Sequence, residues 1–275
     1  MAISVNTNAA ALVALQNLNK TTDNLTSTQG RISTGLKVGS AKDNASVWAI
    51  AQQQRAEVSS LSAVTDSLNR ATSIADVATA AGQSVSDLLN TLKQKVVAAQ
   101  DTSLDPASRS ALNADYTSIV RQISQVVSSA SFDGANILDG SITGLKFIAD
   151  ADATTYITLS TQNFSLGGSI ITFGSTSTIG TVTAATTVAG QLDSSIKNVN
   201  AALANVGAQS NQIEAHNKFV TKLSDALTTG IGHLVDADLA TESARLQALQ
   251  VQQQLGTQAL SIANQGPQII LSLFK

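Results

Sequence analysis

The sequence predicts a mainly α-helical fold: a long coiled-coil helical hairpin forming a rod, with paired terminal helices and a small β-hairpin insertion. Three observations predict it. Hydrophobic residues make up 43% of the 275 residues but aromatic residues only 3%, which suits long packed helices better than a core built around a pocket. Apolar residues recur at alternating spacings of three and four over long stretches, as on one face of a helix. The chain has only two prolines, Pro106 and Pro267, so long helices meet few breaks.

The two ends of the chain carry almost no charge. Residues 1–19 and 246–274 contain no Asp, Glu, Lys or Arg, although these make up 13% of the sequence. Gln, Asn, Ser and Ala surround the Leu, Ile and Val residues instead. Because an unpaired ion is costly to remove from water, whereas an amide can be satisfied by a hydrogen bond, such segments suit burial on several sides. We therefore expect both ends to pack against other copies of the chain.

Spacings of seven predict a helix at each end. Leu18, Leu25 and Ile32 share one phase, and Leu255 and Ile262 share another. Short helices need packing to persist in water, so these helices are expected to pair. The residues expected to form the self-assembly interface are Val5, Leu12, Leu15, Leu18, Leu25, Ile32, Leu246, Leu255, Ile262, Ile269 and Leu273.

The clearest periodic segment predicts a long helix over about residues 44–100. Its apolar seam runs from Leu61 to Ala99 without a slip, and Gly82 is its one position that is merely small. Ser40 and Asp43 have the spacing of a capping box, which predicts the helix start. We interpret the seam as an ordinary intramolecular coiled coil.

Two further helices and a joint are expected. Asp105 or Ser103 can cap a helix, and Pro106 suits its first turn. Helical spacing resumes at Leu192 and continues to about Leu234, and two glycines within residues 230–232 weaken the helix and predict a joint.

A β-rich insertion is expected between these helices, over about residues 141–188. Thr, Ser and Gly increase there, and short β-branched runs occur at 146–148, 156–159 and 170–173. Gly167 and its neighbouring glycine predict a turn between the last two runs, so one or two hairpins are expected.

No catalytic, cofactor or metal site is expected. The two histidines, His216 and His233, suit a helix surface or an interface. The segment around Asp236 and Asp238 lacks the Gly and bidentate Glu of a calcium loop, and residues 230–232 lack the third glycine of a dinucleotide fingerprint. A net charge of −3 offers no basic surface for nucleic acid, and no apolar run suits a membrane span.

Four ordered motifs resemble those of bacterial flagellins. They are residues 2–8, residues 31–45, residues 132–138 and residues 259–274. The chain is similar to that family over all but roughly residues 141–188. It looks like a short, alphaproteobacterial-like flagellin without a separate outer domain.

The resemblance implies a structural subunit that self-assembles into the flagellar filament for swimming motility, and not an enzyme. It implies three parts. The terminal helices, residues 1–42 and 233–275, would form an inner tube. A helical rod would comprise residues 43–140 and 189–232, and residues 141–188 would be a β-rich insertion at the surface.

Partners and location also follow from the resemblance. Besides other copies of the chain, it implies a flagellar export chaperone, the filament cap and the hook-junction proteins. It implies type III export without a cleaved signal peptide, an extracellular place in the filament, and possible O-glycosylation of Ser or Thr within residues 160–187. Residues 89–95 lack the first Arg and the Glu of the stretch that the innate receptor TLR5 recognises in some flagellins, so TLR5 recognition is not expected.

Two other classes of protein stay open. A hook–filament junction protein shares the terminal helices, and a coiled-coil binding module would form monomers or short oligomers. The Ser-Leu-Phe-Lys ending and the complete motif at residues 31–45 favour a flagellin.

Overall fold

The computed structural model describes residues 7–273. Within that range the elements are α1 (Ala9–Thr34), α2 (Ala45–Ala99), α3 (Pro106–Ser129), β1 (Leu145–Ile148), β2 (Tyr156–Leu159), α4 (Val182–Val235) and α5 (Leu239–Leu273). The expected mainly α fold with a small β-hairpin and paired terminal helices is confirmed. Two compact units form: a terminal unit, Met1–Ala56 with Ala226–Lys275, and a central unit, Glu57–Asp225.

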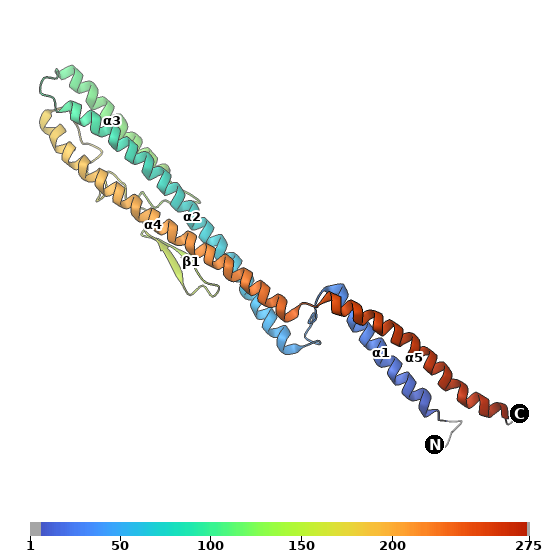
Figure 1. Ribbon diagram of the computed structural model, residues 1–275. Coiled ribbons are helices and arrows are strands. Elements are labelled where there is room, and N and C mark those ends of the chain that lie inside the picture. The colour runs from blue at the N-terminus through green and yellow to red at the C-terminus, as the bar shows by residue number, and fades with distance from the viewer. Residues whose placement is uncertain (1–6, 274–275) are drawn as a thin grey trace. The chain divides into compact units, whose positions relative to one another are not determined.

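The terminal unit is built on α1 and α5, which lie side by side and run antiparallel (Figure 1). Asn8 caps α1, since its side-chain oxygen accepts a hydrogen bond from the Ala11 amide at 3.1 Å. Its Nδ2 donates to the carbonyl of Ala263 on α5 at 2.7 Å. Gly35 ends α1 with φ of 72°, a left-handed conformation that glycine adopts without steric cost.

The loops that follow α1 and α4 pair with each other. The Lys37 amide donates to the carbonyl of Val235 at 2.7 Å, and the Ala237 amide donates to that of Gly35 at 2.9 Å. These backbone bonds hold the end of α1 beside the start of α5, although more than 200 residues separate them.

The long seam predicted in the central unit is confirmed. All twelve predicted positions from Leu61 to Ala99, Gly82 included, are buried along α2. A Cβ added at Gly82 would lie 2.5 Å from Cδ2 of Leu203 on α4 and 3.4 Å from the Phe164 ring, so a larger residue here would require Leu203 to shift. Figure 1 shows α2 and α4 side by side there.

The start of α2 differs from the expected capping box. Asn44 caps the helix, because its side-chain oxygen accepts a hydrogen bond from the Val47 amide at 3.2 Å. The Asp43 carboxylate instead turns back to the loop, where it accepts hydrogen bonds from the amides of Ser40 at 2.9 Å and Gly39 at 3.1 Å. The hydrogen bonds of Ser40 lower the pKa of Asp43.

The predicted start of α3 is confirmed. Asp105 caps the helix through the Ser108 amide at 2.8 Å, and Pro106 is its first residue. Buried Arg109 closes the loop before it, donating to the carbonyls of Ala99 and Asp101.

The insertion contains one hairpin, formed by β1 and β2 with Leu145 opposite Leu159. One or two hairpins were expected and one forms, but the turn at Gly167 does not join two paired strands. The Gly167 amide closes a loop by donating to the Phe173 carbonyl at 2.8 Å, while Ile171 and Phe173 are fully buried in the central unit. The alternating apolar residues of this run therefore face helices, not a neighbouring strand.

The glycines of the expected joint do not interrupt the helix, which was expected to extend to about Leu234. Residues 230–232 remain helical, and α4 ends only at Val235. The Asp236 carboxylate lies over Gly232, where an added Cβ would be 2.8 Å from its Oδ2.

Among the helices described over residues 7–273, none combines the length and the hydropathy needed to span a membrane.

Candidate functional site

The face of α5 that packs on α1 forms one continuous stripe. Its buried or half-buried residues recur at spacings of three and four: Leu246, Leu249, Gln253, Gly256, Leu260 and Ala263. The corresponding stripe of α1 comprises Ala11, Ala14, Leu18, Thr21, Leu25, Thr28 and Ile32. Gly256 lets the helices approach closely, because an added Cβ would lie 3.2 Å from Cδ1 of Leu18. We call these two stripes the inner seam.

A single ion pair crosses the inner seam among the described residues. Arg31, in the last turn of α1, donates to Glu242, in the first turn of α5, at 3.0 Å. The positive Arg31 lies at the partly negative C-terminal end of α1, and the negative Glu242 lies at the partly positive N-terminal end of α5, so each charge also interacts favourably with the dipole of its own helix. Glu242 is only 8% exposed, and its Oε2 and the Arg31 Nε are buried without a hydrogen-bond partner. The sequence analysis missed this pair.

The start of α5 is fixed by a capping carboxylate. Asp238 accepts hydrogen bonds from the Ala240 amide at 3.0 Å and the Thr241 hydroxyl at 2.6 Å. The Thr241 hydroxyl is the main cause of a lowered pKa of Asp238, so the carboxylate stays charged at the helix N-terminus.

The opposite side of α5 carries exposed apolar side chains. Leu255 is 62% exposed, Ile262 is 63% exposed, and Val251 is also exposed. Their spacings of four and seven place them along one line, and a helix turns about 100° per residue, so this line lies roughly opposite the inner seam. We call Val251, Leu255 and Ile262 the outer ridge.

A groove lies between the first turns of α1 and the part of α5 around Leu260. Its volume is about 390 Å³, and its apolar lining comes from Leu12, Leu15 and Leu260. Leu12 and Leu15 are themselves exposed. The remaining lining residues are Thr7, Asn8, Ala11 and Asn264. We call this the end groove.

The residues expected to form the interface thus fall into three sets. Exposed on the outer surface are Leu12, Leu15, Leu255 and Ile262, whereas half-buried in the inner seam are Leu18, Leu25, Ile32 and Leu246. Val5 lies outside the described residues, and the side chains of Ile269 and Leu273 lie outside them too. The sequence analysis missed Val251, whose spacing of four from Leu255 could have revealed it.

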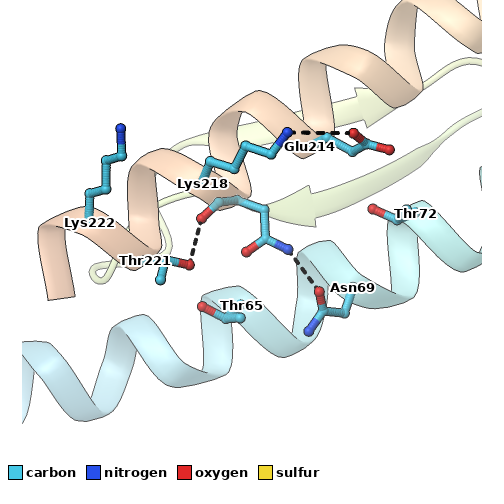
Figure 2. Close-up of a pocket in the computed structure, with 8 residues that line it drawn as sticks. Thr65, Asn69, Thr72, Glu214, Lys218, Thr221 and Lys222 are labelled. Carbon is cyan, nitrogen blue, oxygen red and sulfur yellow. Dashed lines mark hydrogen bonds and ion pairs between the residues drawn. The ribbon is translucent and has the colours of Figure 1, made fainter. Parts of the chain in front are cut away.

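A groove in the central unit has a different chemistry. It lies between α2 and α4, has a volume of about 600 Å³ and is lined by Thr, Asn, Glu and Lys side chains (Figure 2). Asn217 donates to Asn69 across it at 2.8 Å, and Lys218 approaches Glu214 at 4.0 Å. These side chains largely bind one another, as on an ordinary helix surface. Over the described part of the chain, no cluster of His, Asp or Glu could hold a metal ion.

Both lysines of residues 89–95 also have intramolecular partners. Lys93 pairs with Asp193 and Lys95 with Asp115, each at 2.7 Å, while Leu89 is buried.

The comparisons with known proteins agree across the chain. Residues 5–143 match the family model of the bacterial flagellin N-terminal helical region, and residues 189–274 match that of the C-terminal helical region. Flagellin FljJ of Caulobacter vibrioides is 53% identical, covering 100% of this chain and 99% of the relative. A flagellin of Brucella melitensis is 37% identical, covering 99% of each. A solved putative flagellar hook-associated protein from Vibrio parahaemolyticus shares the fold, with a TM-score of 0.59, 13% identity, and coverage of 70% of this chain and 100% of that one.

Proposed function

This chain belongs to the bacterial flagellin family, and we propose that its terminal unit is the surface through which copies polymerise. It is a structural subunit of the bacterial flagellar filament, which serves motility. Its likeness to a hook-associated protein is one of fold alone, whereas whole-length sequence relatives are flagellins.

The observation that supports the polymer contact is the outer ridge. Leu255 and Ile262 are more than half exposed on a segment that holds no charged side chain. Burying a Leu or Ile side chain contributes about 1.5–3 kcal/mol, and a filament repeats that contact at every subunit. An exposed ion on the same face would oppose this burial, because it would have to leave water without a partner.

We assign the parts of the filament accordingly. Residues 1–42 and 233–275 form the inner tube, residues 43–140 and 189–232 form the outer helical layer, and residues 141–188 form the β-rich insertion at its surface. Support comes from the compact terminal unit, whose helices α1 and α5 contain the uncharged stretches within residues 1–19 and 246–274.

Further partners are proposed on the family resemblance. An export chaperone, the filament cap and the hook-junction proteins would each bind subunits, and export would proceed through the type III apparatus without a cleaved signal peptide. Exposed hydroxyl residues between 160 and 187, such as Thr176, are candidates for O-glycosylation. Recognition by TLR5 is not expected, because residues 89–95 lack the first Arg and the Glu of the stretch that this receptor recognises in some flagellins.

The test compares two charge insertions at exposed positions. Leu255→Glu places a charge on the outer ridge, and Thr176→Glu places one on an exposed site of the central unit. We expect the unsubstituted chain and Thr176→Glu to form long tubes visible by electron microscopy and recovered by sedimentation. Leu255→Glu should stay in the supernatant. Equal sedimentation of both variants would refute the assignment, and short oligomers of the unsubstituted chain would favour a coiled-coil binding module.

A further inference from the structure

One side of α4 binds the insertion at four places. The α4 residues that make hydrogen bonds to the backbone of residues 149–172 are Ser195, Asn198, Gln209 and His216. Their spacings of three, eleven and seven residues are each within about one residue of whole helical turns, so they form one line along roughly 32 Å of the helix. We call these four residues the α4 row. Figure 1 shows the hairpin beside this helix.

Two members of the α4 row accept hydrogen bonds from amides of the insertion. Ser195 is fully buried, and its Oγ accepts from the Thr172 amide at 3.0 Å. Half-buried Gln209 turns its Oε1 to the Ser160 amide at 2.7 Å. Both amides lie outside β1 and β2, so neither has a partner in the strand ladder. The helix therefore supplies acceptors that a sheet would otherwise provide.

The other two members donate hydrogen bonds to carbonyls of the insertion. The Nδ2 of Asn198 donates to the carbonyls of Ser169 at 3.1 Å and Ile170 at 3.4 Å. The Nε2 of His216 lies 2.7 Å from the Ala149 carbonyl oxygen. Because a carbonyl oxygen can only accept, Nε2 carries the proton in this bond. The α4 row thus binds backbone groups of both kinds.

The insertion runs antiparallel to α4 along this row. From Ser195 to His216 the bound groups come from residues 172, 169–170, 160 and 149, in falling order. Side chains on the outward side of the hairpin, such as Lys146 and Tyr156, are exposed. The contact therefore does not depend on which side chains the outward side of the hairpin carries.

Burial of apolar side chains does not by itself fix where the insertion lies. The insertion buries the side chains of Phe147, Leu159, Phe164, Ile171 and Phe173. Their burial is favourable but has no preferred direction, whereas a hydrogen bond requires a narrow range of distance and angle. A shift of the insertion along α4 could keep part of the apolar burial, but it would leave the polar groups of the row and their backbone partners unpaired.

We propose that the α4 row is an intramolecular binding surface for the backbone of the insertion, which sets the position of the insertion along the helix. The buried apolar side chains supply most of the attraction, and the row supplies the register. The insertion is a strap whose place depends on α4 and not on its own exposed side chains. All the groups involved lie within the central unit, so this device is independent of the proposed polymer contact.

The same chemical change at two positions of the row should have opposite results. Gln209→Glu and Asn198→Asp each replace an amide by a carboxylate of nearly equal size. Glutamate at 209 keeps an oxygen for the Ser160 amide, so exchange of that amide should stay within about twofold of the unsubstituted chain. Aspartate at 198 turns an oxygen toward two carbonyl oxygens, so exchange of the nearby Thr172 amide should accelerate about tenfold or more. Amide hydrogen exchange measured by NMR resolves both amides.

Two matched variants serve as controls. Gln209→Ala removes the acceptor and should accelerate exchange of the Ser160 amide about fivefold or more. A double variant, Lys146→Thr with Tyr156→Thr, changes exposed side chains of the hairpin and should leave exchange of both amides unchanged. Exchange of the helical amides of α2 and α4 in the same spectra shows that each variant retains its fold.

Three results would overturn the proposal. The first is equal loss of protection at Ser160 in Gln209→Glu and Gln209→Ala. The second is unchanged exchange of the Thr172 amide in Asn198→Asp, and the third is faster exchange of either amide in the hairpin double variant. If Asn198→Asp does not fold, Asn198→Ala removes the same donor without adding a charge, and unchanged exchange of the Thr172 amide in that variant overturns the proposal equally.

Discussion

At the scale of single residues, the ion pair between Arg31 and Glu242 is exceptional in a helix pair held together by neutral side chains. Neutral side chains such as Leu, Ala, Thr and Gln along the inner seam can be buried in more than one register without leaving an ion unpaired. A buried charge pair penalises every register except the one that brings the two charges together. We therefore expect Arg31 and Glu242 to fix the register of α1 against α5.

Removing one member of the pair should weaken the terminal unit. Glu242→Ala leaves the half-buried Arg31 guanidinium without its carboxylate, which should cost about 1–3 kcal/mol, reduced from the fully buried case by the exposure of Arg31. Amide hydrogen exchange along α1 and α5 measures the loss. Arg245→Ala, at an exposed position of the same helix, is the control and should change exchange little. Similar effects of both substitutions would contradict the role of the pair.

The sequence pattern identified apolar stripes along the terminal helices but not the directions in which they face. A spacing of seven describes Leu18 and Leu25 as well as Leu255 and Ile262, yet the first two face the partner helix and the last two face solvent. The period of a helix defines a stripe but not what covers it. The side of α5 that faces α1 is identified by the position of Gly256, which lies against Leu18.

At the scale of elements, one glycine determines how closely α2 and α4 pack. Replacing glycine by alanine inside a helix normally stabilises it by about 1 kcal/mol. At Gly82 the new methyl group would lie 2.5 Å from Leu203, whereas at Gly207 on α4 nothing lies within 4 Å. We expect Gly207→Ala to stabilise the central unit and Gly82→Ala to lose that gain or destabilise it, because Leu203 must move.

Chemical denaturation followed by circular dichroism compares the two variants directly. Adding Leu203→Ala to Gly82→Ala should recover part of the loss, since it removes the side chain in the way, although it also leaves a cavity. Equal stabilisation by Gly82→Ala and Gly207→Ala would mean that the contact relaxes without cost.

Elements with a long buried seam were predicted well, and short ones less so. The seam from Leu61 to Ala99 repeats often enough that a single period explains it, and every predicted position is buried. The run containing Ile171 and Phe173 alternates as a strand would, but these side chains pack in the helical core of the central unit. Alternation indicates which side chains are buried together and gives no information on whether a strand or a helix covers them.

At the scale of the whole molecule, the two units differ in how completely they bury their apolar residues. The central unit encloses residues from three helices and the insertion, including Leu68, Tyr116 and Phe164. The terminal unit instead leaves the outer ridge and much of the end groove in water. The uncharged ends could be recognised from sequence because the lack of charge extends over each whole segment, whereas the direction in which their side chains face depends on the fold.

The difference predicts the effect of shortening the chain at either end. Deleting about twenty N-terminal residues removes Leu12 and Leu15 from the end groove, and deleting about twenty C-terminal residues removes Ile262 from the outer ridge. The core of the central unit lies within Glu57–Asp225 and includes none of these residues, so it should still unfold cooperatively on heating. Neither shortened chain should polymerise, because each has lost exposed apolar residues of the terminal unit, the proposed polymer contact. Circular dichroism would measure the unfolding, and sedimentation with electron microscopy would measure assembly. Normal filaments from either shortened chain would show that contacts of the central unit suffice for polymerisation, whereas loss of cooperative unfolding would show that the central unit depends on the ends for its fold.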